Sequence, residues 1–129
     1  MTTITIVDES TVGEKHAWSL DFLDETVSLR ELIRQRIYQE VIEYNARLTG
    51  HFRGLVQPTQ AERTLNGFRL PSKNRLDWQA QYEKAIDAFT RRGYLVLVND
   101  EQIADLDAPI ELQADTEVTF FKLVPLVGG

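Results

Sequence analysis

One long amphipathic segment, from Ser28 to Leu48, constrains the possible folds most strongly. Ser28 and Glu31 have the spacing of a capping box, in which hydroxyl and carboxylate each satisfy a backbone N–H, so a helix is predicted to begin at Ser28. Apolar side chains then recur at three- and four-residue steps and form one stripe: Leu29, Leu32, Ile33, Ile37, Val41 and Tyr44. To be buried, this stripe must pack against a flat apolar surface such as a sheet. The polar side chains between are expected to face water: Arg30, Arg34, Glu40 and Glu43.

Strands are predicted on both sides of this helix. The segments Thr3–Val7 and His16–Leu23 alternate polar and apolar residues, and Val12–Glu14 can form the turn of a hairpin between them. Tyr94–Val98 is apolar on both faces, as an interior strand requires, and Glu117–Val124 forms a last strand. The predicted fold class is therefore α+β, with one mixed sheet packed on the long helix.

The region between the long helix and the later strands interrupts this pattern. From Leu48 to Leu76 the periodicity fails and glycine and proline recur, which predicts a long loop or arm. Within it, Thr59 and Glu62 have capping spacing for one short helical turn before a turn at Asn66–Gly67.

A second helix is predicted from Trp78 to Arg92. Asp77 is its N-cap, Gly93 follows its last turn, and its apolar face consists of Trp78, Tyr82, Ala85, Ile86 and Phe89. A turn at Asn99–Asp100 and a corner at Asp107–Ile110 then lead to the last strand.

Composition narrows the functional classes. The chain has 129 residues, the size of one domain, and no cysteine, which removes disulfides, cysteine nucleophiles and thiolate metal sites. Its two histidines, His16 and His51, have no metal-ligand or catalytic spacing, so we expect no enzyme and no metal site. The net charge of −6 disfavours nucleic acid and anionic membranes as partners. No export signal or membrane-spanning run is evident, which places the chain in the cytoplasm.

Several C-terminal motifs carry a resemblance to a known family. In order along the chain they are Val98–Asn99, Asp107–Ile110, Glu117–Val118, Phe120–Phe121 and Gly128–Gly129. This series resembles the end of the β-grasp sulfur carriers, namely the small subunit of molybdopterin synthase and the thiamine-pathway carrier, and more distantly ubiquitin and its bacterial relatives. The resemblance implies a single ubiquitin-like β-grasp domain over residues 1–129, with an insertion at about 48–92 and a flexible tail at 125–129.

The resemblance also implies a chemical role for the terminus. An E1-like adenylating enzyme, using ATP and Mg, would activate the carboxylate of Gly129, and Gly128 would help to keep the tip narrow because glycine has no Cβ. The leading hypothesis is a ubiquitin-like modifier joined through Gly129 to a protein target. The alternatives are a sulfur carrier that forms a C-terminal thiocarboxylate for a cofactor pathway, and a non-covalent protein-binding domain.

Three departures from the family pattern bear on that choice. Asp115–Thr116 replaces the usual Gly-Asp, the tail is two residues longer than in the molybdopterin carrier, and the arm with much of the second helix is additional. A small sulfur carrier needs no such arm, which favours a more specialised modifier. Such a modifier would be monomeric, bind no cofactor itself, and have an E2-like protein, an isopeptidase and protein targets as further partners.

The last strand and the tail supply candidate binding residues. Pro125 cannot donate to a sheet, so Leu126 and Val127 are expected to be apolar contacts on a projecting tail. Alternation places Val118 and Phe120 on one face of the strand, and Phe121 and Leu123 on the other, where they form a patch for a partner. Alternatively, the second helix or the arm covers that face.

Overall fold

The computed structural model describes residues 1–48, 51–58, 61–64, 67–70 and 75–123. In this part of the chain there are ten strands and two helices, which confirms the α+β class with a mixed sheet. The residues form two compact units, Met1–Leu32 with Phe89–Gly129, and Ile33–Ala88.

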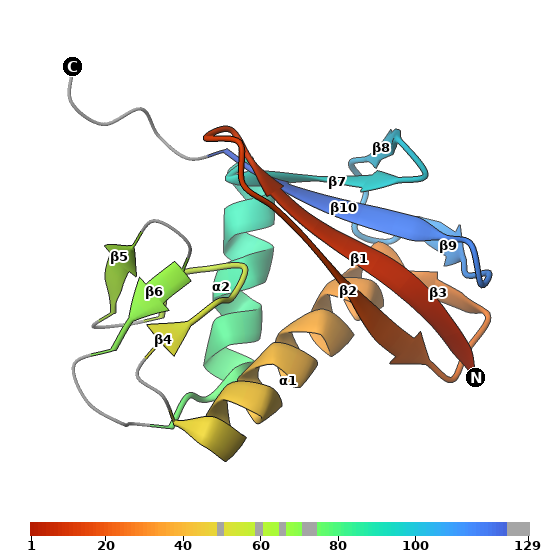
Figure 1. Cartoon of the computed structure of the whole chain (residues 1–129). Coiled ribbons are helices and arrows are strands. Elements are labelled where there is room, and N and C mark those ends of the chain that lie inside the picture. Colours follow the sequence, from red (N-terminus) through yellow and green to blue (C-terminus); the bar gives the residue numbers. More distant parts are fainter. Residues whose placement is uncertain (49–50, 59–60, 65–66, 71–74, 124–129) are drawn as a thin grey trace. The chain divides into compact units, whose positions relative to one another are not determined.

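The first unit is built on a five-stranded sheet in the order β2-β1-β10-β7-β8 (Figure 1). Its strands are β1 (Thr2–Ser10), β2 (Lys15–Phe22), β7 (Tyr94–Val98), β8 (Glu101–Ile103) and β10 (Glu117–Lys122). The first strand and the last, β1 and β10, are parallel neighbours at the centre, and the other neighbours are antiparallel. The sheet is therefore mixed, with β7 inside it as predicted.

Both hairpins of the sheet use turns that the sequence indicated. Gly13 has a φ of 91° in the β1–β2 turn, a conformation that a residue without Cβ adopts easily. Asn99 and Asp100 both have positive φ, 48° and 70°, between the paired residues Val98 and Glu101. This is the pattern of a two-residue type I′ hairpin, for which asparagine and aspartate are well suited.

A two-stranded ladder leads into the long helix, α1 (Leu29–Arg47). It consists of β3 (Thr26–Ser28) and β9 (Pro109–Glu111), which the sequence did not predict. The hydroxyl of Ser28 accepts a hydrogen bond from the N–H of Glu31 at 3.1 Å, which confirms the predicted helix start.

The apolar stripe of α1 is confirmed, since all six of its side chains are buried. Leu29 and Leu32 contribute to the core of the first unit, together with Ile4, Ile6, Leu20, Phe22, Val27, Tyr94, Val96, Ile110, Leu112, Val118 and Phe120. This core lies between one face of the sheet and the start of the helix.

The second unit has strands where the sequence predicted a long loop or arm. It contains β4 (His51–Phe52), β5 (Glu62–Thr64) and β6 (Gly67–Arg69), a three-stranded sheet in the order β4-β6-β5. The short helical turn predicted from Thr59 is wrong, because Glu62 begins a strand; Thr59 and Asn66 themselves lie outside the described residues. These strands are too short to produce an alternating pattern.

The rest of α1 and a second helix, α2 (Trp78–Thr90), complete this unit up to Ala88. Asp77 caps α2 by accepting the N–H of Gln79 at 3.1 Å, as predicted, but the helix ends two residues before the expected Arg92. Within the unit, Trp78 packs edge-on against Tyr38 of α1, with ring centroids 5.3 Å apart.

A buried ion pair links α1 to the arm inside the second unit. The side chains of Arg36 and Glu40 are 1% and 7% exposed, and Arg36 Nε donates to Glu40 Oε2 at 3.2 Å. The other oxygen, Oε1, accepts the backbone N–H of Leu55 at 3.2 Å. The expectation that Glu40 faces water is therefore wrong, because the arm folds back over it.

We expect Glu40→Ala to lower the free energy of unfolding by about 3–5 kcal/mol, since it leaves a buried guanidinium without this carboxylate and the Leu55 N–H without an acceptor. Glu40→Gln keeps an oxygen for Leu55 and should cost less. Urea denaturation measures both values. Glu43→Ala, at an exposed position of the same helix, is the control, with a change within about 0.5 kcal/mol. Costs below about 1 kcal/mol for both Glu40 variants would contradict a structural role for the pair.

Candidate functional site

The end of β10 is the described part of the chain that lies nearest in sequence to the terminal glycines. Val118 and Phe120 are fully buried, and the Phe120 ring lies 6.1 Å from that of Tyr94, centroid to centroid. The predicted inward face of the last strand is therefore confirmed. β10 is a central strand. It pairs with β1 on one side and β7 on the other, and the side chains on one of its faces are buried in the core.

The opposite face of the sheet carries apolar side chains beside the end of β10. Phe121 pairs in register with Glu9 of β1 and Leu95 of β7, and Thr119 pairs with Val7 and Leu97. Directly paired residues project to the same side of a sheet. We call this surface the Phe121 face and define it by Val7, Leu95, Leu97, Phe121 and Leu123.

Exposure varies across the Phe121 face. Leu123 is exposed at 37%, Phe121, Leu95 and Leu97 are half-buried, and Val7 is buried. Phe121 is thus neither a fully exposed anchor nor a core residue. Of these five residues, the sequence singled out Phe121 and Leu123. The β7 residues were missed because an all-apolar strand does not reveal which side chains share a face with β10.

The course of the backbone is fixed up to Leu123. Leu123 N–H donates to the carbonyl of Gly93 at 3.0 Å, and Thr11 N–H donates to the carbonyl of Lys122 at 3.1 Å. The other predicted site residues, Leu126, Val127, Gly128 and Gly129, lie outside the described residues.

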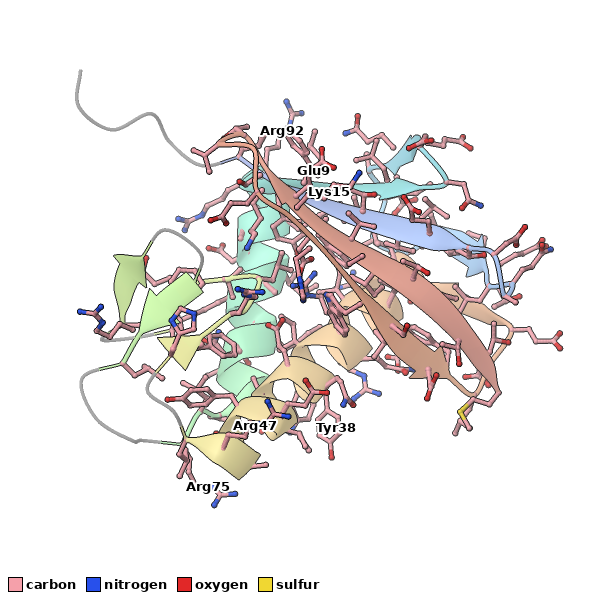
Figure 2. All side chains as sticks on the ribbon, in the orientation of Figure 1. Glu9, Lys15, Tyr38, Arg47, Arg75 and Arg92 are labelled. Carbon is pink, nitrogen blue, oxygen red and sulfur yellow. The ribbon has the colours of Figure 1, made fainter. Side chains whose placement is uncertain are left out.

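An exposed ion pair borders the Phe121 face at the β1–β2 hairpin. Lys15 Nζ lies 3.9 Å from Glu9 Oε1, and Figure 2 shows the two side chains close together near the turn. Their side chains are 67% and 34% exposed, so solvent screens the pair and its contribution to stability is small. The pair gives this edge of the apolar face a polar rim.

Among the described residues, no group of three or more His, Cys, Asp or Glu side chains could hold a metal ion, and His16 and His51 are both exposed. Neither described helix is long and apolar enough to cross a membrane. Comparison of the chain with protein-family models, curated proteins and solved structures found no match.

The two faces of β10 should respond differently to truncation. Phe120→Ala removes a fully buried ring and should lower the free energy of unfolding by about 3–5 kcal/mol. Leu123→Ala should cost less than about 1 kcal/mol because the side chain is exposed, with Phe121→Ala between the two. Chemical denaturation measures all three. Equal costs for Phe120 and Phe121 would mean that Phe121 is a core residue and no partner contact.

Proposed function

We propose that this chain is a ubiquitin-like protein modifier of the β-grasp type, whose terminal glycine is adenylated by an E1-like enzyme and transferred to a protein target. One observation carries the proposal: the first and last strands are parallel neighbours at the centre of a five-stranded mixed sheet, with the order β2-β1-β10-β7-β8. A central first and last strand, with a helix after the opening hairpin, is the arrangement typical of β-grasp proteins. Gly128 and Gly129 follow five and six residues after Leu123 in the sequence.

The proposed chemistry needs only the terminus of this chain. A carboxylate oxygen of Gly129 attacks the α-phosphorus of ATP and pyrophosphate leaves, which forms a mixed anhydride with AMP. An amine of the target then attacks the glycine carbonyl, AMP leaves, the amine loses a proton, and an amide bond forms. The chain has no cysteine, so a partner supplies any thiolate that carries the acyl group between these steps. ATP and Mg are held by the activating enzyme, and the chain alone has no turnover.

The Phe121 face is the proposed contact for the activating enzyme. Its exposed member, Leu123, and the half-buried Phe121 lie at the end of β10, where the chain continues toward the glycines. A partner that holds this face can keep the terminus near a single reaction site, and such restriction strongly accelerates attack on a bound phosphate. The modifier acts as a monomer in the cytoplasm.

A sulfur carrier would use the same activated terminus, with sulfide in place of the amine as the final nucleophile. The second compact unit favours conjugation over sulfur transfer. It spans Ile33–Ala88 and contains its own three-stranded sheet, which presenting a thiocarboxylate does not require. In a modifier, this second unit would provide additional surface for binding other proteins.

Shortening or widening the terminus should abolish activation without affecting the fold. Deletion of Gly129 moves the carboxylate back by about 3.3 Å of extended chain, and Gly128→Val adds a branched side chain to a tip that enters a narrow site. We expect each change to lower ATP–pyrophosphate exchange with the cognate activating enzyme by at least about 100-fold.

The thermal unfolding midpoint should stay unchanged in both variants. Leu23→Ala, a truncation at a position that is 84% exposed and outside the Phe121 face, is the matched control and should exchange normally. Normal exchange by the chain without Gly129 would overturn the proposed function.

A further inference from the structure

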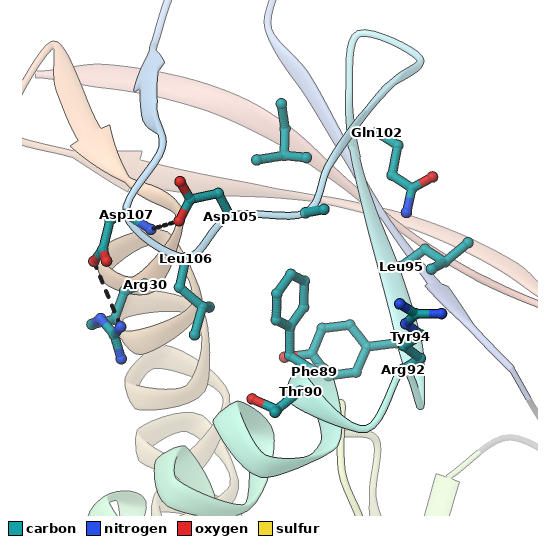
Figure 3. A pocket seen from close by; sticks show the side chains of 12 residues that line it. Arg30, Phe89, Thr90, Arg92, Tyr94, Leu95, Gln102, Asp105, Leu106 and Asp107 are labelled. Carbon is teal, nitrogen blue, oxygen red and sulfur yellow. Dashed lines mark hydrogen bonds and ion pairs between the residues drawn. The ribbon is translucent and has the colours of Figure 1, made fainter.

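A cleft of about 820 Å³ lies within the first unit (Figure 3), and its lining residues are distant in sequence from the terminal glycines. It is bounded by the end of α2, the strands β7 and β8, the loop 104–107 and the first turn of α1. Its size is in the range of typical ligand sites. The proposed carrier chemistry uses none of the charged groups in it.

One wall of the cleft is held by backbone hydrogen bonds. The carbonyls of Leu106 and Ala108 accept the N–H groups of Arg30 and Leu29 at 2.9 and 3.1 Å, which satisfies two donors of the first turn of α1. Asp105 Oδ1 accepts the N–H of Asp107 at 2.9 Å. Because this wall is already ordered, binding there does not require the loop to fold first.

The floor of the cleft contains packed aromatic rings. Tyr94 is 2% exposed, and its ring centroid lies 5.7 Å from that of Phe89 and 6.1 Å from that of Phe120. Leu106 and Leu95 line the cleft and are half-buried, so apolar surface remains available to a ligand. An apolar side chain that covered this floor would be removed from water.

The charged side chains of the cleft lie on two opposite sides. Arg92 lies on one side, whereas Asp105, Asp107 and Arg30 lie on the other (Figure 3). Arg30 is paired with Asp107 at 3.5 Å. Arg92 is exposed and has no ion-pair partner among the residues that the structure describes.

Arg92 also has an unfavourable backbone conformation. Its φ is 61°, in the left-handed region, just after α2 ends, a position where glycine is strongly preferred. Gly93 follows directly, so the chain places the arginine, and not its glycine, at the strained position. Backbone strain of this kind is common where a side chain is held for binding.

We propose that this cleft binds a short peptide segment of a partner protein that carries one carboxylate beside a bulky apolar side chain. A carboxylate of the segment pairs with Arg92, and an adjacent bulky apolar side chain covers the half-buried Phe89 and Leu106. A guanidinium presents parallel donors that match one carboxylate. The opposite wall carries Asp105 and Asp107, and the whole chain has a net charge of −6, so a polyanion such as nucleic acid is disfavoured. The inference goes beyond the proposed function, because it does not involve the terminus.

Selection of displayed random octapeptides on the full chain tests this inference. We expect recovered peptides to contain Asp or Glu beside a bulky apolar residue. The most enriched peptide, and its counterpart with Gln or Asn in place of the acids, are then measured by fluorescence anisotropy against the wild-type chain, Arg92→Gly and Arg91→Gln. Arg91→Gln removes the same charge one residue away, from a side chain that does not line the cleft.

The acidic peptide should lose about tenfold or more in affinity with Arg92→Gly and little with Arg91→Gln. In Arg92→Gly the acidic and amide peptides should bind equally, as expected when one interaction accounts for the difference. The midpoint of thermal unfolding of Arg92→Gly should not fall, and should rise by a few degrees, because glycine relieves the left-handed conformation. The proposal would be overturned if no binders with Asp or Glu were recovered. It would also be overturned if the recovered peptides bound Arg92→Gly as tightly as the wild-type chain.

Discussion

The parallel pairing of β1 with β10 is the interaction on which the first unit depends. It runs in register from Thr5 opposite Glu117 to Ser10 opposite Lys122, and so joins segments from the two ends of the chain. Closing such a long loop is entropically costly, and the buried side chains of these two strands offset that cost: Ile4, Ile6, Val118 and Phe120. Every other strand of the sheet is added to this pair, β2 beside β1 and then β7 and β8 beside β10. The same pairing fixes the path of the backbone up to Lys122, and the hydrogen bond from the Leu123 N–H to the Gly93 carbonyl extends it by one residue.

The sequence predicted correctly those elements whose conformation is set by residues close together in the chain. The capping serine of α1, the Asn99–Asp100 turn and the all-apolar interior strand were each correct because the residues themselves set the conformation. The strands of two or three residues were missed, since so short a segment has no period to detect. The sequence predicts that Glu40 faces water, because no neighbouring residue indicates that the arm folds back and that the N–H of Leu55 donates to the Glu40 carboxylate.

The same contrast applies to the functional surfaces. Alternation along the last strand correctly separated Phe120 from Phe121, whereas the neighbours Val7 and Leu95 follow only from the register of three strands. The cleft beside Arg92 could not be predicted from the sequence. It depends on a left-handed backbone angle after α2 and on a loop that caps α1, and neither is visible in a sequence pattern. The first unit thus offers two neighbouring surfaces, one at the end of β10 and one at the cleft, and Leu95 contributes to both.

The central claim is that the carboxylate of Gly129 is the reactive group of this protein. Its most direct test is mass spectrometry of the C-terminal tryptic peptide, Leu123–Gly129, from the full chain recovered from its own cells. We predict a branched species in which the Gly129 carbonyl is joined to an amine or hydroxyl of another protein. A thiocarboxylate on Gly129 would assign the chain to sulfur transfer instead. Recovery of only the free carboxylate, in cells that contain ATP and the activating enzyme, would contradict the account.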